Sequence, residues 1–227
     1  MKKPTVELIL SATRASWSVS TNHGTESDKD KRLPKELREK ILKRDDYTCQ
    51  GCLFRSLRFQ EIHHRDSDHR NYDENNLTTL CPLCHQVFHL PLAATTMGGT
   101  IIWLPEISQA DINRLCIGIL SVPKSQPKSR YFGVSRALFG AMEGRKSFVD
   151  KLGSNDPGVV AQMLINMTPK QYKERHEIVQ HLRLLPTNTR FEEQASYWAS
   201  EKFNNFEESK ISSIVSKIDI EKLKNDK

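Results

Sequence analysis

Hydrophobic and polar residues follow two different periods along the chain. Within residues 5–20, Val6, Leu8 and Leu10 stand at alternate positions, which predicts a small hairpin near the N-terminus. The following residues, 21–31, are polar and have the composition of a loop. Residues 33–43 carry apolar side chains at helical spacing among charged ones, and this pattern predicts an amphipathic helix.

The second half of the chain has mainly the helical period. A Gly-Gly pair before residues 100–104 predicts a short strand, and Ser108 is the expected N-cap of a helix over residues 109–121. Two prolines within residues 122–130 indicate a linker. A further helix is expected from Tyr131 to Phe148. Two more are expected after the caps Asp156 and Thr168, and the second of these runs on through Leu185. A last helix is expected over about residues 190–206.

These elements predict an α+β protein in which a compact metal-binding module is followed by a mainly helical domain. The expected segments are N-terminal strands and a polar loop (residues 1–30), the metal module (31–95), a strand and helix (96–122), the helical domain (131–207), and a charged amphipathic tail (208–227). The tail is either a marginal terminal helix or a segment that becomes ordered against a partner.

Composition and charge narrow the possible functions. Of 227 residues, 37% are hydrophobic and 27% charged, and no run of 18 apolar residues occurs, so insertion into a membrane is not expected. The short apolar run "VELIL" does not make a signal peptide, which favours a reducing cytosolic compartment. Residues 31–89 contain 11 Lys+Arg against 9 Asp+Glu, whereas residues 120–190 contain 12 against 5. The metal module is therefore not a strongly basic surface, and nucleic acid is a secondary expectation as partner.

Four of the five cysteines form two C-x-x-C pairs, Cys49/Cys52 and Cys81/Cys84. In a cytosolic protein such pairs are typical of metal ligands, and four thiolates suit one tetrahedral zinc ion. We therefore predict one structural Zn²⁺ per chain, in a closed site without catalytic chemistry. The alternative is four unrelated thiols. Cys116, in "NRLCIGIL", is interpreted as a small core residue.

Five of the eight histidines lie within residues 61–90. His85 and His89 are four residues apart, so one face of a helix would present both imidazoles to a single ion. Three imidazoles on a divalent metal leave positions open for a phosphate oxygen and water, and a further histidine can act as general base. The alternative is a polar surface on a zinc fold that holds no second ion.

The ordered combination of cysteine pairs, "EIHH", "NNL" and "HQVFH" resembles the HNH nuclease family and its ββα-metal fold over about residues 33–90. The resemblance implies that His64 is the base that activates water and that Asn76 holds the loop orienting it. It also implies that His63, His85 and His89 bind a second, catalytic divalent metal, and that the four cysteines form structural zinc knuckles.

A second resemblance covers about residues 33–201 and is carried by "CPLCHQVFHL", "GGTIIWLPEISQADINRLC", "LGSNDPGVVAQMLIN" and "HLRLLPTNTRFEEQASYWA". These blocks are similar to the IcmJ/DotN family of Dot/Icm type IVB secretion systems. The resemblance implies a zinc-binding, HNH-like adaptor in the coupling complex, which holds the C-terminal part of the coupling ATPase. It implies a place in the bacterial cytoplasm, at the cytoplasmic face of the inner membrane.

The two resemblances lead to two hypotheses of different kinds. The first is a zinc-stabilised adaptor that binds the coupling ATPase and other coupling-complex subunits. The second is a metal-dependent HNH endonuclease that hydrolyses DNA phosphodiesters. The family is associated with a degenerated histidine motif, whereas this sequence keeps its histidines.

Overall fold

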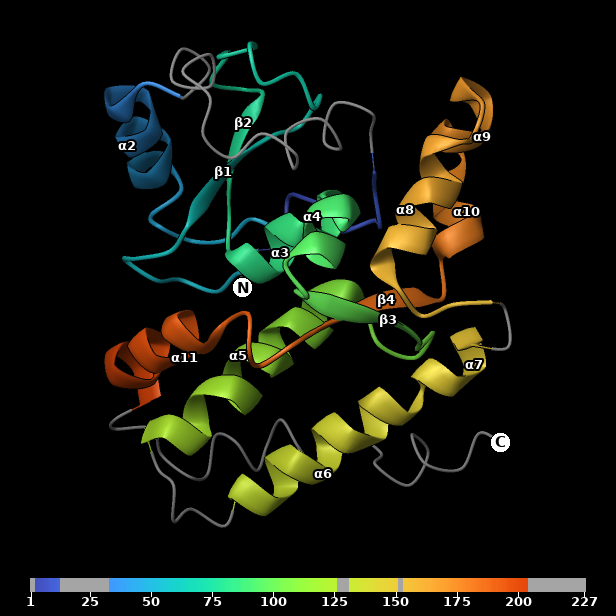
Figure 1. Cartoon of the computed structure of the whole chain (residues 1–227). Coiled ribbons are helices and arrows are strands. Elements are labelled where there is room, and N and C mark those ends of the chain that lie inside the picture. The colour runs from blue at the N-terminus through green and yellow to red at the C-terminus, as the bar shows by residue number, and fades with distance from the viewer. Residues whose placement is uncertain (1–2, 13–32, 126–130, 151–152, 204–227) are drawn as a thin grey trace.

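A computed structural model describes residues 3–12, 33–125, 131–150 and 153–203. Within these ranges, helices surround two small antiparallel sheets of two strands each, which confirms the predicted α+β class (Figure 1). None of the described helices is long and apolar enough to span a bilayer. The predicted tail, 208–227, lies outside the described residues.

The first sheet forms the centre of the metal module. Strand β1 (Glu61–His64) pairs with β2 (Leu77–Leu80), with Glu61 opposite Leu80 and His64 opposite Leu77. Helix α2 (Lys35–Arg44) packs on this sheet and buries Ile41 and Leu42, which confirms the amphipathic helix predicted over residues 33–43. Helix α3 (Pro82–His85) follows β2 directly, so the module has the order β-β-α.

The second sheet joins segments that lie far apart in the sequence. Strand β3 (Gly99–Trp103) was predicted almost in full, and it pairs with β4 (Leu182–Pro186). The prediction of a helix running from residue 168 to 185 is wrong beyond Val179, because β4 pairs along β3. The Gln109 side chain holds the strand as well, accepting from the Leu184 N–H and donating to the Leu184 carbonyl, at 2.8 Å each.

The second half contains the helices α5 (Gln109–Ser125), α6 (Tyr131–Gly144), α7 (Lys146–Asp150), α8 (Pro157–Ile165), α9 (Pro169–Lys173), α10 (Arg175–Val179) and α11 (Glu192–Trp198), with a π-helical turn at Ala199–Phe203. Helices α5, α8 and α9 begin directly after the predicted caps. The helix predicted from Tyr131 to Phe148 is divided into α6 and α7. Asp156 accepts a hydrogen bond from the Gly158 N–H at 2.6 Å, and Thr168 forms a capping box with Gln171. Helix α5 runs on to Ser125, so the predicted linker at 122–130 begins too early. Pro123 sits in its last turn.

The N-terminal segment, residues 3–12, contains no strand, so the described half of the predicted hairpin is wrong. The N–H groups of Thr5 and Val6 both donate to the Gln50 carbonyl, at 3.0 and 3.2 Å, while the Ser11 N–H donates to the Val87 carbonyl at 3.0 Å. The segment therefore binds the metal module through its backbone. The other half of the predicted hairpin falls on residues 13–20, outside the described ranges.

Two hydrophobic cores each combine residues of the metal module with residues of the second half. The first contains Leu80 together with Ile112, Cys116 and Trp198, which are at most 1% exposed. The second combines residues from several elements, namely Leu90, Ile101, Leu164 and Leu184. Cys116 is a core residue as predicted, and burial raises its pKa to about 12.

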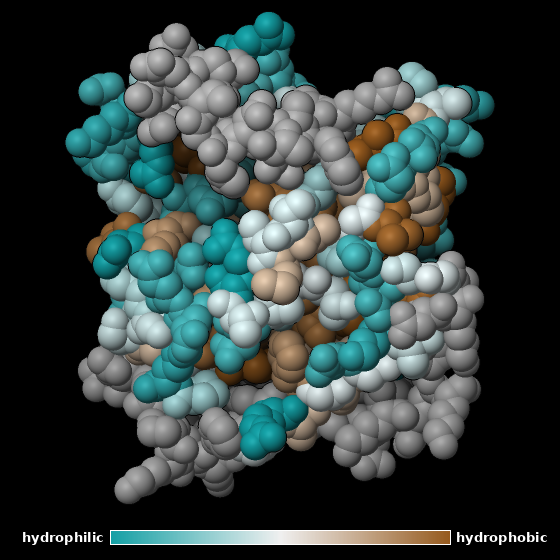
Figure 2. All heavy atoms as spheres, in the orientation of Figure 1, coloured by the Kyte–Doolittle hydropathy of each residue, from teal (hydrophilic) through white to brown (hydrophobic). Residues whose placement is uncertain are grey.

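The surface is largely hydrophilic in the view of Figure 2, with apolar atoms gathered over α8 and α10. These helices carry the exposed residues Val159, Met163 and Ile178.

Candidate metal centres

The four predicted zinc ligands come together from two tight turns. In the first, the Leu53 N–H donates to the Cys49 carbonyl at 2.8 Å and the Cys52 N–H donates to the Cys49 sulfur at 3.4 Å. Leu53 adopts a positive φ of 64° in this turn. In the second, Cys81 precedes α3 in extended backbone and accepts from the Cys84 N–H at 3.0 Å. The end of β2 thus places the pair Cys81/Cys84 next to the pair Cys49/Cys52.

The four sulfur atoms lie within 4.8 Å of one another, and all four cysteines are 0% exposed. The Sγ atoms of Cys52 and Cys81 are 3.7 Å apart, far longer than a disulfide bond. A tetrahedral zinc ion with bonds of about 2.3 Å sets its sulfur atoms roughly 3.8 Å apart. The arrangement therefore fits one tetrahedral metal ion bound by four sulfur ligands.

The electrostatics of the cluster are compatible with a bound cation. Burial raises the pKa of Cys81 and Cys84 well above the usual range of a thiol. Burial also opposes ionisation of Cys49, but hydrogen bonds from the other three thiols outweigh it and lower the pKa of Cys49. Without a cation, ionisation of one thiol makes ionisation of the other three less favourable. A divalent ion instead stabilises all four thiolates together.

Three of the histidines form a second cluster beside the first sheet. His63 lies on β1, His85 ends α3, and His89 follows the 3₁₀ turn Gln86–Phe88, and their candidate ligand atoms lie within 4.8 Å of one another. The Nε2 atoms of His85 and His89 are 3.1 Å apart. A 3₁₀ turn interrupts the helix predicted through His85 and His89, yet both imidazoles still point to the same place.

The histidine cluster has the properties of an uncharged ligand set. Burial, followed by the neighbouring His85, lowers the pKa of His63 to about 3 and that of His89 to about 2. Both imidazoles are therefore neutral at physiological pH, the form that binds metal ions. His63 Nδ1 is buried and has no hydrogen-bond partner among the described residues, which leaves it available. The ring of His63 is fixed by stacking on Phe88, with centroids 4.4 Å apart.

Glu61 is a site residue that the sequence interpretation missed. Its Oε2 lies 2.5 Å from His85 Nδ1, an arrangement in which the carboxylate accepts from that nitrogen and leaves Nε2 free as a ligand. Glu61 and His63 are two residues apart on β1, and alternate residues of a strand share a face. This spacing was the available signal.

His64 and Asn76 are not part of the three-histidine cluster. His64 is 7% exposed and stacks on His69 at 4.8 Å, and burial together with His69 lowers its pKa, so its imidazole is neutral and able to accept a proton. Asn76 closes the connecting loop: its Nδ2 donates to Asp66 Oδ1 at 2.9 Å and to the Asn71 carbonyl at 3.1 Å. Its Oδ1 accepts from the Asp66 N–H at 3.0 Å.

Comparison with known proteins supplies the family. No protein-family model matches the chain. The chain is 30% identical over 199 residues to the Type 4 apparatus protein DotN of Legionella pneumophila subsp. pneumophila, and the match covers 86% of this chain and 90% of that protein. Similarity over nearly the full length of both proteins confirms the second of the two resemblances in the sequence. The chain belongs to the IcmJ/DotN family.

Proposed function

We propose that this chain is a zinc-stabilised adaptor subunit of a type IV secretion apparatus. The observation that carries the proposal is the 30% identity to DotN, which extends over 90% of a protein named as a component of such an apparatus. A match of this extent includes the metal module and the helical half together, so the proposal applies to the whole chain and not to a shared zinc motif.

The proposed partner is the C-terminal part of the coupling ATPase, together with other subunits of the coupling complex. In this role the chain acts in the bacterial cytoplasm, at the cytoplasmic face of the inner membrane. The near balance of 11 basic and 9 acidic residues over residues 31–89 supports a protein partner over the nucleic-acid backbone, which favours clustered positive charge. One zinc ion at Cys49, Cys52, Cys81 and Cys84 stabilises the fold and takes no part in chemistry.

The test is capture of the purified C-terminal segment of the cognate coupling ATPase by the full-length chain, quantified by calorimetry. We expect saturable binding by the wild type and by His64→Ala, because adaptor binding does not use a general base. Zinc-loaded, folded wild-type protein that fails to bind the ATPase segment would argue against the adaptor role.

A second candidate is a metal-dependent HNH endonuclease, and the convergence of His63, His85 and His89 favours it. A divalent ion held there would supply a Lewis acid for a phosphodiester oxygen. His64, neutral and unpartnered at Nε2 within the described residues, would take a proton from water, and Asn76 would keep its loop in place. Strand β1 delivers both adjacent histidines to this region.

The nuclease candidate is tested by incubating supercoiled plasmid with the protein and Mg²⁺, Mn²⁺, Ni²⁺ or Zn²⁺ at several pH values. Plasmid cleavage that is due to this protein is expected to disappear in His64→Ala and His85→Ala, while both variants keep the zinc of the cysteine site. Equal nicking by wild type and His64→Ala would indicate a contaminating nuclease, and uncut plasmid under every condition would exclude DNA as substrate.

A further inference from the structure

A buried amide on α5 contacts the four-cysteine cluster from outside the metal module. Asn113 is 0% exposed, and its Nδ2 lies 3.3 Å from Cys84 Sγ and 3.2 Å from the Leu83 carbonyl oxygen. The two N–H groups of one amide thus meet a sulfur and a carbonyl, which are both acceptors. Asn113 belongs to α5, beyond residues 33–90, the part that resembles HNH nucleases.

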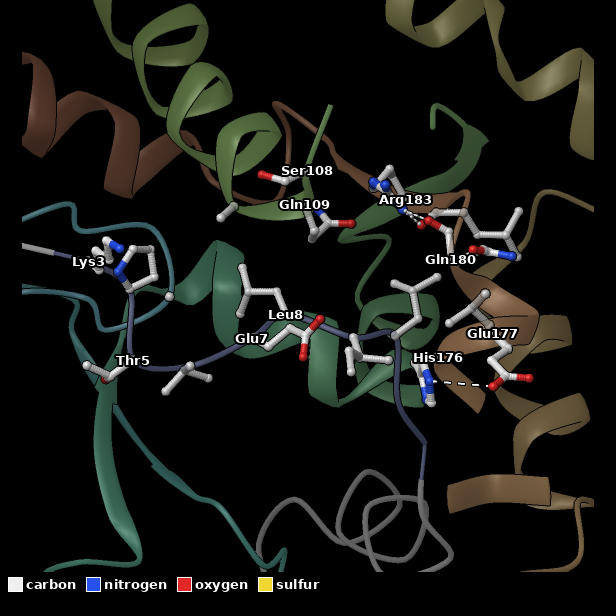
Figure 3. Close-up of a pocket in the computed structure, with 18 residues that line it drawn as sticks. Lys3, Thr5, Glu7, Leu8, Ser108, Gln109, His176, Glu177, Gln180 and Arg183 are labelled. Atoms are coloured by element: carbon white, nitrogen blue, oxygen red, sulfur yellow. Dashed lines mark hydrogen bonds and ion pairs between the residues drawn. The ribbon is translucent and has the colours of Figure 1, made fainter. Parts of the chain in front are cut away.

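The orientation of this amide is determined by its neighbours. Gln109, one helical turn earlier, donates from Nε2 to Asn113 Oδ1 at 2.9 Å and is itself fixed by the main chain of Leu184. Rotating the Asn113 amide by half a turn would place its oxygen against two acceptors and its nitrogen against a donor. The donor therefore faces Cys84. Gln109 also lines a cavity of about 720 Å³, as does Arg183 (Figure 3).

The neighbouring residue on α5 supports the other cysteine pair. Arg114 Nε donates to the Cys52 carbonyl at 2.9 Å, so consecutive residues of α5 contact both turns that carry ligands. Asp111 in turn accepts from Arg114 Nη1 at 3.1 Å and holds the guanidinium in place.

We propose that Asn113 is an outer-shell residue of the metal centre, which donates a hydrogen bond to the Cys84 thiolate and slows release of the metal ion. The inference rests on the proposed zinc ion at the four cysteines. Four thiolates and one Zn²⁺ leave a net charge of about −2 in a site without solvent contact. A hydrogen bond donated to a thiolate stabilises its charged form, so protonation or attack at that sulfur becomes harder.

Because the donor sits on α5, metal retention depends on the docking of the helical half against the module. Outer-shell partners of metal ligands commonly change metal affinity by about 10–100-fold when they are replaced. We therefore expect Asn113→Leu, which removes the donor and keeps the number of side-chain heavy atoms, to release zinc to a chelator at least about tenfold faster than the wild type.

The matched control is Leu164→Ala, which leaves a cavity in the second core, a core that contains neither Asn113 nor the four cysteines. Zinc release to excess chelator, the sulfur-to-cobalt charge-transfer band of the Co²⁺-substituted protein, and alkylation of Cys84 are measured for wild type and both variants. Asn113→Leu is expected to change all three, and Leu164→Ala to lower only the melting temperature. Asn113→Ser, too short to reach the sulfur, replaces Asn113→Leu if the latter does not fold.

Wild-type release rates and an unchanged cobalt spectrum in the Asn113 variants would overturn the inference and leave Asn113 as an ordinary core hydrogen bond. Wild-type protein that is folded but holds no metal would overturn the zinc assignment itself, and the inference with it. The first outcome leaves the adaptor proposal untouched, whereas the second removes its zinc component.

Discussion

Cys52 and Cys81 are 29 positions apart in the sequence, yet their sulfur atoms lie 3.7 Å from each other in the interior of the protein. Burial alone gives these four thiols little stabilising free energy, since a buried thiol behaves like a small apolar side chain. A bound metal ion would make the same arrangement a large contribution to stability, because binding energy at a structural zinc site is folding energy.

Replacing one zinc ligand is therefore expected to prevent folding. Cys49→Ser and Cys81→Ser remove a ligand from a site whose metal contributes on the order of 10 kcal/mol in small zinc domains. Thermal unfolding followed by circular dichroism, with zinc content measured on the same samples, checks this expectation.

Cys116→Ala is the matched control, since Cys116 is equally buried but lies outside the cluster. We expect it to lower the free energy of unfolding by about 1–2 kcal/mol and to keep the zinc. Ligand variants that melt at the wild-type temperature would show that the four cysteines are ordinary core residues.

The candidate metal ligands could be predicted from the sequence where they lie within a few residues of one another. Two C-x-x-C pairs and the i, i+4 pair His85/His89 are complete signals within a few residues. Asn113 has no such signal, because nothing in "NRLC" indicates that its amide will bond to Leu83 and Cys84 on α3. A residue that acts through a tertiary contact becomes visible only once the fold is known.

At the scale of elements, α2 and the caps of α8 and α9 agree with their sequence patterns, because local propensity and burial favour the same conformation. Strand β4 is the exception. Its residues continue the helical pattern of α10, but pairing with β3 supplies backbone partners that a local pattern does not contain.

Glu201, in the π-helical turn after α11, contacts the segment that follows the first cysteine turn. Its carboxylate accepts from Ser56 Oγ at 2.7 Å and from the Leu57 N–H at 3.0 Å, and the side chain is only 12% exposed. Glu201→Gln loses one acceptor and places an amide donor near a donor, so we expect the free energy of unfolding to fall by about 1–2 kcal/mol in urea titrations.

Glu192→Gln is the control for this substitution. Glu192 pairs with Lys124 at 3.2 Å but is 71% exposed, so the change is expected to be under about 0.5 kcal/mol. Equal effects of the two substitutions would mean that the contact of Glu201 with the segment after the first cysteine turn adds nothing to stability.

Asp45 connects the end of α2 to β2. Its carboxylate, 10% exposed, accepts from the Thr79 N–H at 3.0 Å and from Arg44 at 2.8 Å. Burial would raise the pKa of Asp45, but these hydrogen bonds outweigh it and lower the pKa below the ordinary 3.8. A carboxyl group with a lowered pKa stabilises the fold above its unfolded pKa, and this contribution is lost only as pH falls through the folded pKa.

Asp45→Asn is therefore expected to destabilise the protein by about 1 kcal/mol, by the same amount at every pH between about 5 and 8. Urea unfolding of both proteins across this range measures the difference. A difference that shrinks already at pH 5 would mean that the folded pKa is raised, contrary to the hydrogen bonds around Asp45.

At the scale of the whole molecule, the two cores make the metal module and the helical half one cooperative unit. Trp198, 0% exposed, packs edge-on against Phe54 beside the cysteine turn, with ring centroids 5.3 Å apart. Stripping the metal with a strong chelator is expected to shift the tryptophan emission of the protein to the red and to reduce helical circular dichroism in the same transition. Trp198→Phe serves as the control for the source of the fluorescence change. Loss of zinc without any change in either signal would contradict a shared core.

The most direct test is the metal content of the full-length chain purified without chelator, measured by mass spectrometry of the metals in wild type, Cys81→Ser and His85→Ala. We expect one zinc per chain that resists dialysis, is kept in His85→Ala, and is absent from Cys81→Ser. A folded wild-type chain without zinc, or a zinc content unaffected by Cys81→Ser, would show that the four cysteines do not form a structural zinc site.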